Sequence, residues 1–174
     1  MNHAVYETPR LFLERLDDRH IGDLYRLLSN EKVHKHFPRT LNKQESELFL
    51  QKVRACYFHD GFGFRAVIRK EDKQFLGICG LLKQIVDGKE EVEVGYRIQD
   101  AFWGSGYGTE AALACMEYAR DILHRESVIS LIRPINSQSL RVAEKNGMTH
   151  ERDTIFHGLL HRVYRHRFPS TCPT

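Results

Sequence analysis

The sequence predicts an α+β fold, in which a mixed sheet carries helices on its faces as three α/β/α layers. Three observations predict this class. The hydrophobic pattern switches between strand and helix periods in the order β-α-α-β-β-β-α-β-α-β-β. A glycine-rich turn at residues 103–109 joins a strand directly to a helix. The 174 residues, 41% hydrophobic, suit a full core, so we expect one domain over residues 1–174 with its core at 8–168.

The first predicted elements are a strand and two helices. Residues 11–16 alternate between apolar and polar side chains as a strand does. Asp17 or Asp18 can cap the helix that follows, because a short carboxylate accepts hydrogen bonds from free backbone N–H groups. Asn42 followed by Glu45 matches a capping box and predicts the start of a second helix. Gly61 ends that helix, since glycine adopts the left-handed conformation easily.

Three strands are predicted next, at residues 64–69, 75–85 and 91–98, the last two joined by an Asp87-Gly88 turn. The remaining predicted elements are a helix to about residue 122, a strand at 128–132, a helix at 137–146 stopped by Gly147, and a hairpin of strands at 149–156 and 159–168 around His157-Gly158.

The most informative stretch is the glycine-rich turn, Trp-Gly-Ser-Gly-Tyr-Gly-Thr, at residues 103–109. Its glycines allow a sharp turn, so that several backbone N–H groups converge on one point. The helix that follows adds its free N–H groups and the positive end of its dipole. A pyrophosphate fits such a site, and the stretch therefore predicts a nucleotide-derived cofactor.

A nicotinamide or flavin oxidoreductase is one alternative, because Gly104, Gly106 and Gly108 superficially resemble GxGxxG. The third glycine comes one residue early, and the unit lies mid-chain rather than in a leading βαβ motif. The following strand, 128–132, is apolar and offers no acid to a ribose. These departures disfavour the oxidoreductase.

Composition excludes several classes of protein. The net charge is +3, without the basic stripe of a nucleic-acid-binding protein. No apolar run approaches the ~20 residues of a membrane span, and the N-terminus lacks a signal-peptide core. The cysteines are widely spaced, which favours a reducing compartment and predicts a cytoplasmic protein; they are Cys56, Cys79, Cys115 and Cys172.

Two clusters of basic side chains are open to more than one interpretation. His34 and His36 resemble a metal-ligand pair, but no supporting cysteine or carboxylate cluster is present, so we expect a solvated helix end and no metal. The C-terminal arginines form either a solvated strand face, which the pattern favours, or a surface for an acidic ligand; they are Arg152, Arg162, Arg165 and Arg167.

Five stretches in register, at residues 8–16, 75–81, 92–96, 103–112 and 136–148, resemble the GNAT N-acetyltransferases. Among these the sequence is most similar to the RimJ/RimL-like branch, which acetylates the N-termini of ribosomal proteins. The resemblance implies the GNAT acyl-CoA N-acyltransferase fold, a mixed and mostly antiparallel sheet with one parallel pair splayed around the cofactor. It also implies acetyl-CoA as co-substrate, without a metal.

The implied activity is direct transfer of the acetyl group to a primary amine. The resemblance to the RimJ/RimL-like branch favours a protein or peptide N-terminus of the ribosomal-protein type as that amine. Small amines such as antibiotics, polyamines or amino acids are alternative acceptors, and a non-catalytic acetyl-CoA-binding module is a further alternative. By resemblance, residues 29–40 and the closing hairpin form the acceptor pocket. A monomer and a homodimer both remain open.

The resemblance also implies which residues bind the cofactor. Backbone N–H groups of the turn would hold the pyrophosphate, the end of the strand at 91–98 would pair with the pantetheine arm, and Asn136 would bond that arm from the far side. Trp103 occupies a position where the family carries Gln or Arg. The full set is Tyr96, Arg97, Ile98, Trp103, Gly104, Ser105, Gly106, Tyr107, Gly108, Thr109, Asn136 and Ser139.

Glu93 is the candidate general base. It alternates with Val92 and Val94, so its side chain points to the opposite face of the strand, and it matches the glutamate of the family's Ala-Glu-Ile-Gly-Tyr-like stretch. An ammonium must lose a proton before it attacks, and a carboxylate can accept that proton directly or through water. An ordinary surface glutamate on a strand is the alternative.

Ser139 is the candidate donor to the departing sulfur, because RimJ/RimL-like enzymes carry a serine there. Ala143 stands where many GNAT enzymes place an acidic tyrosine. The alternative for Ser139 is a structural serine at a helix start capped by Ser137. Tyr96 and Tyr107 are further candidate donors, and Tyr107 is expected to pack the loop. A backbone N–H within residues 96–98 would meet the oxyanion.

Overall fold

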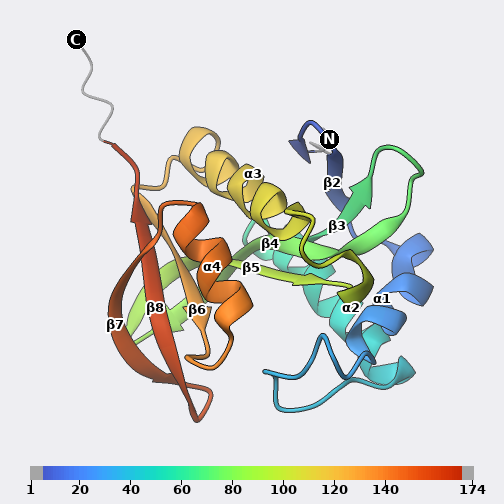
Figure 1. The fold of residues 1–174 in the computed structure, drawn as a ribbon, viewed down its shortest axis with the longest axis horizontal. Helices are drawn as coiled ribbons and strands as arrows, with labels where there is room; N and C mark the ends of the chain where they lie inside the picture. The colour runs from blue at the N-terminus through green and yellow to red at the C-terminus, as the bar shows by residue number, and fades with distance from the viewer. Residues whose placement is uncertain (1–5, 170–174) are drawn as a thin grey trace.

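The computed structural model describes residues 6–169, which form one eight-stranded sheet in the order β1-β2-β3-β4-β5-β6-β8-β7 (Figure 1). All neighbouring strands are antiparallel except the pair β5 and β6. The strands are β1 (Tyr6–Glu7), β2 (Leu11–Arg15), β3 (Phe64–Arg69), β4 (Phe75–Val86), β5 (Lys89–Ile98), β6 (Ser127–Ile132), β7 (Thr149–Phe156) and β8 (Leu159–Arg167). The helices are α1 (Ile21–Leu28), α2 (Lys43–His59), α3 (Tyr107–Asp121) and α4 (Ser137–Lys145), with short 3-10 turns at Asp18–His20 and Asp100–Phe102.

Helices cover both faces of the sheet, which confirms the predicted three layers. On one face the apolar side chains of β5 pack with those of α3 in a core that includes Val92, Val94, Ala111 and Cys115. On the other face α1 and α2 pack against β3 and β4. Cys79 and Cys115 are free thiols within the first core, as expected of small buried hydrophobic side chains.

The predicted helix ends are largely confirmed. The Asn42 side chain accepts from the backbone N–H of Glu45 at 2.9 Å, and the Glu45 carboxylate accepts from the backbone N–H of Asn42 at 2.8 Å. Gly61 has a left-handed φ of 81° just beyond α2. Asp17 caps the 3-10 turn rather than α1 itself, so the first helical segment begins earlier than α1.

Two features at the ends of the chain lie outside the predictions. The sequence pattern predicts no strand at Tyr6–Glu7, because two residues are too few to show a period; β1 exists by pairing with β2. Cys172 lies outside the described residues. Among residues 6–169, none of the helices combines the length and apolar character that crossing a bilayer requires.

The parallel strands β5 and β6 separate almost as soon as they meet. Their one register pair within the described residues is Glu93 opposite Ile129. One step further along, the Ser130 hydroxyl donates to the Val94 carbonyl at 2.9 Å, so a side chain bridges the strands. β6 meanwhile pairs with β8 along its whole length. The sheet therefore opens between Val94 and the end of β5, as predicted for a splayed pair.

Candidate active site

The glycine-rich turn leads into α3 with the conformation that the sequence predicts. Gly104 and Gly106 have left-handed φ values of 78° and 80°. Gly106 is the N-cap of α3 and provides no side-chain hydrogen bond to the helix. The first N–H groups of this 15-residue helix are therefore open to an anion, and the helix dipole adds to the attraction.

The N-terminal strand region holds the glycine-rich turn in place. The Arg10 guanidinium donates to the carbonyl of Ser105 at 2.9 Å and to the Glu110 carboxylate at 2.6 Å. Thr8 donates to the same carboxylate at 2.6 Å, and Arg10 also lies over the Tyr107 ring. The sequence pattern predicts no role for Arg10 or Glu110. Their positions within the stretches 8–16 and 103–112, which resemble the family, could have pointed to such a role.

Trp103 ties the start of the turn to the end of β5. Its indole N–H donates to the carbonyl of Ile98 at 2.8 Å. The side chain thus braces the backbone on which the predicted cofactor site depends. Gly108 lies over the same strand end, where an added Cβ would meet the side chains of Ile98 and Tyr96 at 3.8 and 3.9 Å. The turn, the helix start and the end of β5 are therefore in one place.

Glu93 lies on β5 beside the point where the strands separate, and it is partly accessible to solvent. Gln84 donates to its carboxylate at 2.8 Å. Burial is the largest influence on this group and raises its pKa from 4.5 to about 7, while hydrogen bonds from Gln84 and the Leu131 backbone and the charge of Arg97 oppose the rise. A base with a pKa near neutrality is well matched to proton transfer at physiological pH.

The raised pKa predicts that Glu93→Gln stabilises the fold in alkaline solution. The folded state binds this proton more tightly than the unfolded chain, so wild-type stability falls as the pH rises from about 4.5 to about 7. Glutamine does not ionise, so its burial does not become less favourable as the pH rises. We expect the variant to be more stable than wild type by up to about 3 kcal/mol at pH 8. Thermal melts should show this gain shrinking toward pH 5; an equal difference at both values would contradict the assigned pKa.

α4 begins beside the end of β5, on the face opposite Glu93. Its N-cap is Asn136, whose side-chain oxygen accepts from the Ser139 N–H at 3.1 Å, so the expectation of a Ser137 cap is wrong. Asparagine provides both an acceptor and an amide group, and only the acceptor is used here. The Tyr96 hydroxyl donates to the Ser139 carbonyl at 3.0 Å. Burial raises the Tyr96 pKa, so this phenol keeps its proton at neutral pH.

The predicted site residues thus divide between the two faces of β5. Tyr96, Ser139 and Asn136 lie on the side of α3 and α4 with the glycine-rich turn. Glu93 and the side chain of Arg97 lie on the other side, because strand residues two or four apart share a face. Within the described residues no register pair beyond Glu93 and Ile129 joins β5 to β6, so backbone pairing does not close the sheet between these two sides.

His34 is not the solvated helix end that the sequence predicts. Its side chain is buried, and its Nε2 lies 3.0 Å from the Arg97 guanidinium. Burial and the Arg97 charge lower the His34 pKa to about 4, so the ring is neutral at physiological pH. Arg97 also lies over the Phe37 ring at 4.1 Å. In the described part of the chain no group of three or more metal-binding side chains occurs.

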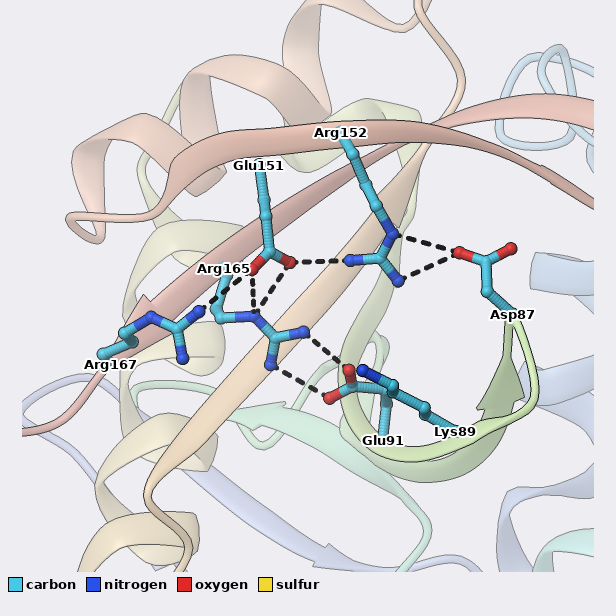
Figure 2. Close-up of a pocket in the computed structure, with 7 residues that line it drawn as sticks. All are labelled: Asp87, Lys89, Glu91, Glu151, Arg152, Arg165 and Arg167. Carbon is cyan, nitrogen blue, oxygen red and sulfur yellow. Dashed lines mark hydrogen bonds and ion pairs between the residues drawn. The ribbon is translucent and has the colours of Figure 1, made fainter.

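Two of the C-terminal arginines differ from the solvated face that the pattern favoured, whereas the Arg167 side chain is exposed as expected. Arg165 is about 10% exposed and pairs with Glu91 at 2.6 Å and Glu151 at 2.9 Å. Arg152 pairs with Asp87 at 3.0 Å. Figure 2 shows this network around a pocket of about 470 Å³. It joins β5 and the turn before it to the β7–β8 hairpin, and Arg165 also donates to the Ser127 hydroxyl on β6 at 2.9 Å.

Comparison with known proteins agrees with this geometry. Residues 10–149 match the family model described as an acetyltransferase (GNAT) domain. The uncharacterized protein YkkB of Bacillus subtilis (strain 168) is 31% identical over 144 residues, covering 81% of this chain and 83% of that protein.

Two solved structures share the fold. One is a putative ribosomal-protein-serine acetyltransferase from Vibrio cholerae, with a TM-score of 0.81, 19% identity and coverage of 96% of this chain and 99% of that chain. The other is RimL, a ribosomal L7/L12 alpha-N-protein acetyltransferase in complex with coenzyme A, with a TM-score of 0.76, 18% identity and coverage of 94% and 98%. With the family model spanning most of its length, the chain belongs to the GNAT acetyltransferases.

Proposed function

We propose that this protein transfers the acetyl group of acetyl-CoA to a primary amine by direct attack, and that the amine is a protein N-terminus of the ribosomal-protein type. The observation that carries the proposal is the opening between β5 and β6. An anion-binding helix start lies on one side of it, and a glutamate with a pKa of about 7 lies on the other.

The names of similar structures support the choice of acceptor and cofactor. Two of these neighbours are described as ribosomal-protein acetyltransferases, and one of them was solved with coenzyme A. A reducing compartment fits the free thiols of Cys56, Cys79 and Cys115. We propose a cytoplasmic enzyme that acts as a monomer or a homodimer.

In this proposal each side of the opening has its own task. The N–H groups of residues 104–109 hold the pyrophosphate, and the backbone of Tyr96–Arg97–Ile98 pairs with the pantetheine arm. The Asn136 amide donates to that arm, because its oxygen already caps α4. This arrangement leaves the thioester at the opening, with its carbonyl near the backbone N–H groups at the end of β5.

Glu93 accepts the proton that the acceptor ammonium must lose before its nitrogen attacks the thioester carbon. A backbone N–H at the end of β5 stabilises the negative charge on the oxygen. The C–S bond then breaks as Ser139 donates a proton to the sulfur, and the second proton that the nitrogen loses restores the Ser139 hydroxyl through solvent. Tyr96 is the alternative donor, since its hydroxyl lies beside Ser139.

The proposed function is tested by thermal melts with acetyl-CoA, CoA and NAD. A ligand at ~100 times its Kd should stabilise the fold by about 2.7 kcal/mol and raise Tm by a few degrees. Acetyl-CoA and CoA should do so and NAD should not; a shift with NAD alone would overturn the proposal. An amine screen led by N-terminal peptides follows. Turnover only with small amines would assign a small amine as the acceptor instead of a protein N-terminus. Turnover with no amine would favour a non-catalytic binding module.

Ser139→Ala is expected to slow transfer by ~10²-fold if the hydroxyl protonates the sulfur. The variant keeps the helix cap intact, because Asn136 bonds the backbone N–H of residue 139 and alanine retains that group. Acetyl-CoA should still raise Tm as in wild type. Tyr96→Phe is the matched variant: a large loss there with little loss in Ser139→Ala would move the donor role to Tyr96.

A further inference from the structure

The face of the sheet that carries Glu93 has positive charges at both ends, but only one end is neutralised. Near the start of β5, Arg152, Arg165 and Arg167 are paired with carboxylates (Figure 2). Where the strands have separated, the same face carries Arg97 on β5 and leads to Arg133 just after β6. The two ends of this face therefore differ in how their positive charges are balanced.

Arg97 is held as a fixed positive charge without a carboxylate partner in ion-pair contact among residues 6–169. Its guanidinium lies 4.1 Å over the Phe37 ring and 5.5 Å over the Phe49 ring, and its hydrogen-bond neighbour is the neutral His34. Burial lowers the Arg97 pKa to about 10, which leaves the group charged at physiological pH. The Glu93 carboxylate lies within electrostatic reach of Arg97 but makes no ion-pair contact with it, so a further anion beside the buried guanidinium is favoured.

Arg133 is the second unmatched charge. Its Nε is buried and has no hydrogen-bond partner within the described residues, and the Nδ1 of His36 is in the same condition. Arg133 lies within electrostatic reach of His36 and of His161 on β8, because its charge contributes to the lowered pKa of both. In Figure 1 the segment at 31–38, coloured blue, extends toward the ends of β6 and of the β7–β8 hairpin.

Building on the proposed function, we propose that the amine acceptor carries an anionic group, a carboxylate or a phosphate, which Arg133 binds while Arg97 adds a second positive charge. The planar fork of a guanidinium matches both groups in a bidentate manner. Glu93 would receive the ammonium end of the same molecule, so the two ends of the acceptor are recognised by opposite charges. The acceptor is then an acidic N-terminal segment or a small amine that bears an acid.

The test compares kcat/KM for matched acceptors that differ only in charge. The pairs are a C-terminally amidated peptide with Asp or Glu near its N-terminus against its Asn or Gln analogue, an amino acid against its amide, and phosphoethanolamine against ethanolamine. Wild type should prefer the anionic member of at least one pair by about tenfold to a hundredfold. The pair that shows the preference identifies the source of the anion.

Arg133→Gln should reduce that preference to within about threefold, because the rate with the anionic acceptor falls toward that with the neutral one. Arg125→Gln is the matched control, since it removes the same charge from an exposed position at the opposite end of β6. Acetyl-CoA should raise the Tm of both variants as in wild type. The proposal is overturned if wild type shows no preference in any pair, or if both variants lose it equally.

A second measurement separates this proposal from the proposed function. With acetyl-CoA bound, succinate or inorganic phosphate should raise the Tm of wild type, while succinamide should not. Arg133→Gln should lose the response and Arg125→Gln should keep it. If no amine is acetylated, the proposed function fails, but this melt still shows whether Arg133 binds an anion. An equal rise in the Tm of Arg133→Gln and wild type would refute the anion site.

Discussion

Glu93→Gln is expected to lower kcat by about 10²- to 10⁴-fold while the affinity for acetyl-CoA stays close to that of wild type. The amide has nearly the shape of the carboxylate, so the bond to Gln84 can be kept, but glutamine cannot accept a proton at neutral pH. The cofactor would lie on the α3 side of β5, away from this side chain. The measurement is steady-state kinetics beside an acetyl-CoA melt.

The pH profile gives the sharper form of this result. Wild-type kcat/KM should rise as the pH increases through about 7, because only the ionised Glu93 can take a proton. This rise in kcat/KM should be absent from Glu93→Gln. Glu90→Gln is the control: Glu90 is an exposed residue of the same strand, paired with Lys83, and its loss should leave the profile intact. An unchanged profile in Glu93→Gln would exclude Glu93 as the base.

Gly106→Glu is expected to weaken acetyl-CoA binding by about 10²-fold or more, which corresponds to about 2.7 kcal/mol. The new carboxylate would stand at the N-terminus of α3, where the pyrophosphate is proposed to bind, and like charges repel there. Isothermal titration, or loss of the Tm rise with acetyl-CoA, measures the effect.

A matched glycine separates charge repulsion from backbone strain. Gly106 has a φ of 80°, so any side chain there is strained. Gly61 has a φ of 81° and nothing near its added Cβ, so Gly61→Glu carries similar strain far from the turn. It should lower Tm without changing the response to acetyl-CoA. Normal binding by a folded Gly106→Glu protein would show that the turn is not the pyrophosphate site.

Local signals determined most of the fold. The capping box at Asn42 and the glycines at 61, 104 and 106 act through the conformation of a few neighbouring residues, so the sequence alone predicts their effect. The same holds for Glu93, whose face of the strand follows from alternation. The family resemblance added the splay between β5 and β6, which the single register pair at Glu93 confirms.

Long-range contacts decided the rest. The Glu93 pKa depends on burial and on Gln84 and Leu131, which arrive from neighbouring strands. Burial of His34 against Arg97 joins residues 63 apart in sequence, and Arg165 meets Glu91 across 74 residues. A histidine after a helix and an arginine on a strand read as solvated in a linear sequence, because nothing local shows what will pack over them. By itself the sequence determined where the chain turns and what could bind there; the tertiary structure decided which charges are paired, which are buried, and which face the opening.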